Sequence, residues 1–111
     1  MSLVTKAEKI LDILDSVEGL NAYHLFKPAT AKAPYAVWQE DSEGQSFHAN
    51  NTKTEQVLTA TVDYFTLTEF DSMIDSIQVA FNDAQIAWRL NSFQYERETN
   101  LLHYEWLIEV I

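Results

Sequence analysis

The sequence predicts an α+β domain, in which two amphipathic helices pack on a mostly antiparallel sheet of four to five strands. Two observations predict this class: apolar residues recur at helical spacing in two segments, and they alternate with polar residues in several others. The expected order of elements is α-β-β-β-α-β-β, and the first of these strands is weakly marked. Because each helix has only one apolar face, both should cover the sheet and not lie within it.

The length and composition favour one domain that spans residues 1–111. A chain of 111 residues is close to the commonest domain size, and 47% hydrophobic residues are enough for one core. No apolar run approaches the roughly 20 residues that span a bilayer, so no membrane partner is expected. The chain has no cysteine, which excludes disulfides, thiolate metal ligands and cysteine nucleophiles.

The charge balance is strongly acidic. Seven Lys and Arg residues stand against seventeen Asp and Glu residues, which gives a formal net charge of −10. Proteins bind nucleic acids largely by neutralising the phosphates with Lys and Arg side chains, and an acidic chain repels phosphates instead. Specific nucleic-acid binding is therefore not expected. The acidity either keeps the protein soluble or favours a basic partner.

The first half of the chain predicts one helix and two strands. Thr5 and Glu8 have capping-box spacing, and apolar residues at helical intervals then predict a helix over 5–18 that stops at Gly19. Residues 20–26 are a weak strand candidate, and 27–34 form a connector broken by two prolines. A short strand is predicted at 35–40. Residues 41–54 are polar and predict a long loop, which is either functional or mobile.

The second half begins with a change of period. Leu58, Ala60, Val62 and Tyr64 alternate with polar residues, which predicts a half-buried strand over 57–66. Helical spacing follows at once, with a second capping box at Thr66 and Glu69. The predicted apolar stripe of this helix consists of Leu67, Phe70, Ile74, Ile77, Phe81 and Ala84. The strand is therefore expected to pass into the helix with only Thr66 and Leu67 at the join, without a glycine or a long loop.

The last two strands predict a hairpin. Alternation over 101–111 is the clearest strand pattern of the chain. A turn centred on Thr99 and Asn100 would place Tyr95 opposite Tyr104 and Phe93 opposite Trp106. The same register continued backwards would expose Trp88 and Leu90, so a β-bulge or break is predicted near Asn91 and Ser92.

Residues that could support chemistry are sparse. With only two glycines there is no glycine-rich phosphate loop. His24, His48 and His103 fall on three different predicted elements, so we expect no metal site, and His103 should face Glu96 across the hairpin. We therefore predict no catalytic residues, no cofactor and no small-molecule substrate, and we expect that the protein is not an enzyme. A buried carboxylate with a perturbed pKa beside a pocket would favour an enzyme instead.

Three apolar residues interrupt polar strand faces: Val57, Phe65 and Leu107. If they adjoin, they would form a patch of the kind that marks a protein interface. The alternative is that the first helix covers them. Phe47, an aromatic residue in a polar segment, either anchors a neighbouring molecule or packs on its own domain.

The pattern resembles the tail terminator, or head-tail joining (tail completion), proteins of long-tailed bacteriophages and prophages. The similarity covers nearly the whole chain: the opening amphipathic helix, "APYAVW" at the first firm strand, a polar loop, "ATVDYFT" before a helix, and the closing "YERETNLLHYEWLIEV" hairpin. These are patterns of residue type and spacing, and none is an invariant chemical motif.

The resemblance implies a structural virion protein that is assembled in the bacterial host cytoplasm. Such a protein forms a ring with copies of itself, a hexamer, which caps the tail tube and docks to head completion proteins. The family has no catalytic residues. Its use of loops and sheet edges for subunit contacts implies contacts here from 41–54, with Phe47, His48 and Lys53, and from the hairpin tip at 97–101.

A second interpretation stays open. The chain also resembles secretion chaperones, which have a similar order of helices and strands and bind an extended partner. This alternative predicts an acidic adaptor with a two-fold dimer interface in place of a ring.

Overall fold

The computed structural model describes residues 2–44, 47–49 and 52–111, and for 47–49 and 52–55 it describes the backbone alone. The α+β class and the predicted sequence of main elements are confirmed, and a short extra hairpin is added. The elements are α1 (Leu3–Asp15), β1 (Ala22–His24), β2 (Tyr35–Glu43), β3 (Phe47–Ala49), β4 (Thr52–Glu55), β5 (Leu58–Thr66), α2 (Met73–Asp83), β6 (Ala87–Glu96) and β7 (Leu101–Val110).

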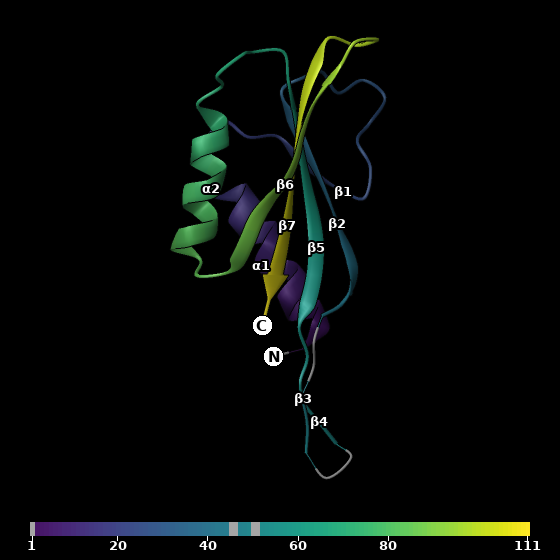
Figure 1. Cartoon of the computed structure of the whole chain (residues 1–111), viewed down its shortest axis with the longest axis vertical. Coiled ribbons are helices and arrows are strands. Elements are labelled where there is room, and N and C mark those ends of the chain that lie inside the picture. Colours follow the sequence, from purple (N-terminus) through teal and green to yellow (C-terminus); the bar gives the residue numbers. More distant parts are fainter. Residues whose placement is uncertain (1, 45–46, 50–51) are drawn as a thin grey trace.

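The main sheet has five strands in the order β1-β2-β5-β7-β6 (Figure 1). Every neighbouring pair is antiparallel except β1 and β2, which are parallel. The weak strand candidate at 20–26 is thus a real strand, three residues long, at one edge of the sheet. The opposite edge is the ten-residue strand β6.

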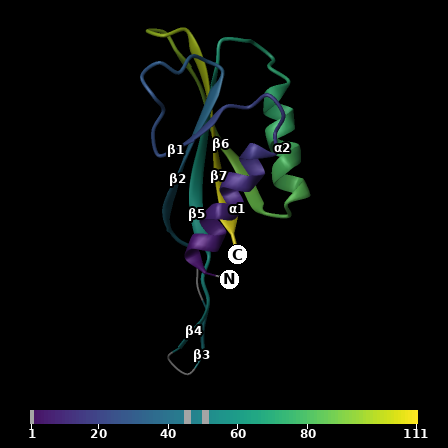
Figure 2. The same cartoon turned by 180° about the vertical axis from the view of Figure 1, so that it is seen from behind.

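Both helices lie on the same face of this sheet, and the core fills the space between the two layers (Figures 1 and 2). Because side chains alternate across a strand, the even-numbered residues of β5 and β7 face this core. The largest fully buried side chains include Trp106, Tyr64, Phe81, Ile10, Leu14 and Ile77. Burial of each large apolar side chain stabilises the fold by about 1.5 to 3 kcal/mol.

Helix α1 begins two residues earlier than predicted. Ser2 is its N-cap, since the Ser2 hydroxyl accepts a hydrogen bond from the backbone N–H of Thr5 at 3.1 Å. Lys6, in the second turn, is only 3% exposed, and its ammonium group donates to the backbone carbonyl of Gln56. This contact ties α1 to the segment between β4 and β5.

The predicted polar loop at 41–54 is wrong in part. Strand β2 continues to Glu43, which pairs with Leu58, and residues 47–49 and 52–55 form the separate β3–β4 hairpin. This hairpin projects from one end of the body (Figure 1), and the molecule measures 52 × 26 × 24 Å. The hairpin lacks the apolar alternation that a buried strand face produces, so the pattern could not indicate it.

The predicted direct joint between β5 and the second helix is also wrong. Helix α2 begins at Met73 with Ser72 as N-cap, and residues 67–72 form a connector. Thr66 is the last residue of β5, and its hydroxyl does not cap a helix through Glu69. Leu67 and Phe70 are exposed, so they do not belong to the buried stripe of α2.

In the β6–β7 hairpin the bulge is confirmed, but the register is wrong by two residues. Phe93 lies opposite Tyr104, and Tyr95 lies opposite Leu102. A shift of two keeps every side chain on its predicted face, since the period of a strand is two. The register changes between Leu90 and Ser92, as predicted, and this change turns Trp88 and Leu90 to the helix side of the sheet.

The predicted partner of His103 is wrong as well. His103 lies opposite Gln94 and not opposite Glu96. Its Nε2 instead lies 2.7 Å from Oδ1 of Asp63 on β5.

Candidate assembly surfaces

The connector between β5 and α2 is anchored by one carboxylate. Oδ2 of Asp71 accepts hydrogen bonds from the Tyr64 hydroxyl at 2.6 Å and from the Thr66 hydroxyl at 2.7 Å. Oδ1 accepts the backbone N–H of Met73 at 2.9 Å. Because the side chains of Tyr64 and Thr66 are buried, this network fixes the start of α2 against the end of β5.

The electrostatics keep this carboxylate ionised. Burial alone would raise the pKa of Asp71, but hydrogen bonds from Tyr64, Met73 and Thr66 outweigh it and hold the pKa below its ordinary value. Burial and the neighbouring carboxylate of Asp71 both raise the pKa of Tyr64. The tyrosine therefore stays a neutral donor and the aspartate a charged acceptor, which is the stronger kind of hydrogen bond.

Phe70 projects from this anchored connector. Its φ angle is 55°, in the left-handed region that bulky residues rarely adopt, and its side chain is 90% exposed. A residue held in such a region costs about 1–3 kcal/mol, and the surrounding structure must supply that energy. The Asp71 network, which begins at the next residue, gives the connector that support.

Phe70 belongs to a larger exposed surface, which we call the aromatic patch. It lies where α2 begins, so the helix does not cover this part of the sheet, and it encloses a hollow of about 530 Å³. The rings of Phe93 and Tyr104 stack across the hairpin with centroids 4.6 Å apart. The patch consists of Leu67, Phe70, Phe93, Tyr95, Leu102 and Tyr104, with Glu69 at its rim.

A second exposed surface lies at the other edge of the sheet, in the segment that connects β1 to β2. Residues 25–34, which we call the basic connector, contain Lys27 and Lys32 and no acidic residue. Phe26 is 75% exposed, and Leu25 beside it is exposed as well, with a φ angle of 73°. Like Phe70, Leu25 is a bulky residue in the left-handed region. The basic connector is thus both apolar and positively charged.

The face of the sheet that the helices leave open carries a row of stacked rings. Phe65 stacks between Tyr35, at 5.1 Å, and His103, at 4.3 Å between ring centroids. Phe65 is therefore half-buried inside a row of side chains from three strands.

His103, at one end of this row, also contacts Asp63. Burial raises the pKa of Asp63 above its ordinary value, and the hydrogen bond from His103 offsets this only in part.

The structure does not bring together the three apolar residues proposed as one patch. Val57 is only 7% exposed. Leu107 lies opposite Thr61, four residues along β5 from Phe65, which corresponds to about 13 Å. Coverage by the first helix is also wrong for Phe65 and Leu107, because α1 packs on the other face.

The remaining predicted contact residues are Phe47, His48 and Lys53. Their backbone lies in the β3–β4 hairpin, where His48 pairs with Lys53. Their side chains lie outside the described part of the structure. The predicted hairpin tip at 97–101 closes the β6–β7 hairpin at the end of the molecule opposite β3 and β4 (Figure 1).

An apolar groove of about 340 Å³ lies between α1 and the strands β1 and β2. The exposed side chains of Leu3, Val4 and Leu11 line it, together with Trp38, whose ring stacks on His24 at 4.1 Å. The buried indole N–H of Trp38 has no acceptor among the described residues. A ligand in this groove would therefore meet a mostly apolar lining, with Glu8 and the His24–Glu40 pair as its polar groups.

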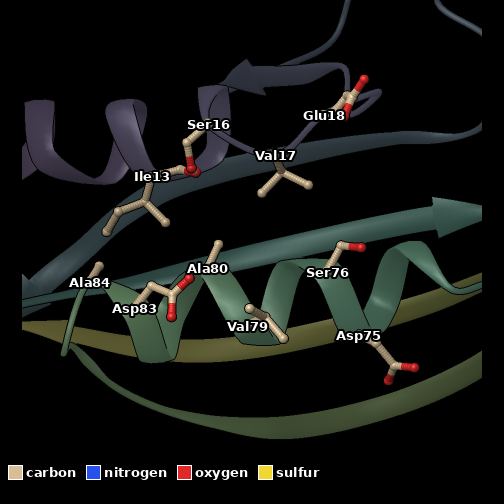
Figure 3. A pocket seen from close by; sticks show the side chains of 10 residues that line it. All are labelled: Ile13, Ser16, Val17, Glu18, Asp75, Ser76, Val79, Ala80, Asp83 and Ala84. Carbon is tan, nitrogen blue, oxygen red and sulfur yellow. The ribbon is translucent and has the colours of Figure 1, made fainter.

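Another hollow, of about 710 Å³, lies between α1 and α2 (Figure 3). Ile13 and Val17 point from α1 toward α2, and Ala80 points back. The carboxylates do not converge: Glu18 lies past the end of α1, and Asp75 points away from α1. This hollow is an open seam between two packed helices.

The part of the chain that the structure describes holds neither a metal cluster nor a membrane-spanning helix. No three or more His, Asp or Glu side chains in that part of the chain are placed to hold a metal ion. Neither described helix is long and apolar enough to cross a membrane.

Sequence reasoning missed the aromatic patch and the basic connector. It assigned Leu67 and Phe70 to a helix and treated 27–34 as a plain linker. The available signal was Asp71 itself, since an aspartate just before a helical stripe is a strong capping residue. No model of a known protein family matches the chain, and no curated protein is significantly similar to it.

Proposed function

We propose that this protein is a structural component of a phage or prophage virion that closes into a ring, caps the tail tube and joins the tail to the head. Its partners are further copies of itself, the tail tube and head completion proteins. The resemblance in the order of elements suggests this role and implies a hexamer.

One observation carries the proposal: the chain presents a strained, fully projecting Phe70 on a connector that is anchored at both ends. An exposed aromatic residue in the left-handed region costs energy in an isolated chain, and exposed apolar residues that adjoin one another are typical of interaction surfaces. Aromatic residues also carry a large share of the binding energy at protein interfaces. A rigid connector supports ring closure, since a contact of variable angle gives open chains.

The test is the mass and shape of the particles that the chain forms, both alone and in the presence of tail tubes. Mass-resolved size determination gives the mass, and negative-stain electron microscopy gives the shape. Annular particles, or caps at the ends of the tubes, support the proposal. Compact two-fold dimers that leave the tubes uncapped would contradict it.

A matched pair of variants sharpens this test. Phe70→Ser removes the projecting ring and should abolish annular particles. Val79→Ser changes another exposed apolar residue, on α2 away from the aromatic patch, and should leave them intact. If both variants behave alike, Phe70 has no special part in assembly.

The groove beside α1 favours a second candidate, an adaptor resembling secretion chaperones. An extended segment could pair with the free edge of β1 and place apolar side chains in the groove that Trp38 lines. This candidate predicts dimers and a shift of the Trp38 indole signal in ¹⁵N NMR spectra when a partner binds.

A further inference from the structure

We propose that the basic connector of one copy docks on the aromatic patch of the next copy, with Phe26 as its apolar anchor. This inference rests on the proposed ring, and it names the two surfaces that form each contact.

The two surfaces are placed for such a contact. The basic connector joins β1 and β2 at one edge of the sheet, and the aromatic patch includes β6 at the other edge. The backbone segments that carry them are the β1–β2 connector, the β5–α2 connector and the closed end of the β6–β7 hairpin, and these lie toward the end of the molecule opposite the β3–β4 hairpin (Figures 1 and 2). Copies arranged side by side would therefore bring the connector of one against the patch of its neighbour at the same height.

The two surfaces are also chemically complementary. Each offers an exposed phenylalanine, Phe26 on the basic connector and Phe70 on the aromatic patch. Lys27 and Lys32 give the connector two positive charges. Glu69 lies at the rim of the patch, and the negative charges of Glu69 and the neighbouring Asp71 both act on Tyr104 within it. In a chain of net charge −10, residues 25–34 are a basic segment that can meet an acidic neighbour without repulsion.

The pairing of two different surfaces fixes the type of assembly. A two-fold dimer would need the connector and the patch of each copy to meet those of the other copy in one interface, but the two surfaces lie at opposite edges of the sheet. A head-to-tail contact instead leaves one unused patch and one unused connector after every addition. Only closure of the ring removes both.

Engineered cysteines test this geometry directly, because the chain has none of its own. Thr30→Cys on the connector and Thr68→Cys on the patch side change exposed residues and keep both phenylalanines and all charges. With a short bismaleimide, the double variant should give a ladder of linked oligomers, and an equimolar mixture of the two single variants should give dimers alone. The control pairs Thr30→Cys with Ser76→Cys on α2, which should stay unlinked.

Charge reversal gives a second, independent measurement by sedimentation velocity. Lys32→Glu and Glu69→Lys should each weaken self-association by about fivefold, and the double reversal should restore it. Phe26→Ser should weaken it by about thirtyfold or more, as loss of an interface anchor does. Its exposure makes a loss of folding unexpected, and circular dichroism checks this.

The outcomes distinguish failure of the contact from failure of the ring. A ladder with the first pair and none with the control supports the contact. Annular particles without these crosslinks would overturn the contact and leave the ring standing. If the Thr68→Cys single variant forms crosslinked dimers with itself, both the contact and the ring are overturned, because two patches then face each other across a two-fold interface. No crosslink at any concentration, with no association, would overturn the contact.

Discussion

Replacement of Asp71 by alanine should destabilise the isolated chain by about 2 kcal/mol. The change leaves the buried hydroxyls of Tyr64 and Thr66 without their charged acceptor, and a buried donor without a partner costs about 1–3 kcal/mol. The sum of two such costs would be about 2–4 kcal/mol. Because Asp71 is only half-buried, water can replace part of what is lost, so the lower end is expected.

Urea denaturation followed by circular dichroism measures this loss. One kcal/mol corresponds to roughly 4 °C in the melting temperature of a domain of this size, so thermal unfolding should show a fall of about 8 °C. Asp75→Ala is the matched control. It removes an exposed carboxylate from the first turn of the same helix, which costs only about 0.5 kcal/mol.

The effect should depend on pH in a defined direction. The pKa of Asp71 in the folded chain lies below its ordinary value of 3.8. The carboxylate therefore contributes its full stabilisation above that value, and the contribution is lost as the pH falls through the folded pKa. The stability gap between the native chain and Asp71→Asn should narrow as the solution is acidified below about pH 4.

A double-mutant cycle with Tyr64→Phe isolates the hydrogen bond. Without the hydroxyl, Asp71→Ala should cost about 1 kcal/mol less than in the native chain. Equal losses for Asp71→Ala and Asp75→Ala, or strict additivity with Tyr64→Phe, would refute the anchoring role of Asp71. The connector would then have to be fixed by other contacts.

Three further changes test other parts of the fold. Phe70→Gly should stabilise the isolated chain by about 0.5–1 kcal/mol in thermal unfolding, since glycine relieves the left-handed strain, while self-association in sedimentation weakens. Lys6→Met should lower stability to urea by about 1–2 kcal/mol, because the carbonyl of Gln56 loses its partner. Deletion of Asn91 removes the bulge and should cost about 3 kcal/mol or more, with a red shift of tryptophan fluorescence as Trp88 turns to solvent. Equal or greater stability after the deletion would contradict the role of the bulge.

Elements with a buried face were predictable, because burial imposes a period on the sequence. The buried face is apolar at every position of β7 and from Leu58 to Tyr64 of β5. A regular strand would place Trp88 and Phe93 on opposite faces, and this was enough to locate the bulge near Asn91. The register could not be found in this way. A slip of two residues preserves the face of every side chain, so the pattern alone cannot distinguish the two alignments.

The candidate surfaces were harder to predict for a physical reason. Leu67 and Phe70 lie at helical spacing from Ile74, so they matched the period of α2 although they lie outside it. What excludes them from the helix is a competition for capping: Asp71 binds the N–H of Met73 and two hydroxyls of β5, whereas Thr66 offers only one side-chain oxygen. Such a tertiary network leaves no periodic signal in the sequence.

The response of assembly to salt should separate the proposed contact from general repulsion. Neighbouring copies of charge −10 lie about 25 Å apart if they stand side by side across the short axes of the molecule. The Debye length falls from about 30 Å at 0.01 M salt to about 10 Å at 0.1 M, so this range relieves the long-range repulsion between whole copies. Pairs between Lys32 and the patch act at contact distance and persist there, and higher salt weakens them in turn. Self-association should therefore rise, pass through a maximum near 0.1 M and then fall, whereas Lys32→Glu should show the rise without the fall. A maximum that survives in Lys32→Glu would mean that other charges hold the copies together.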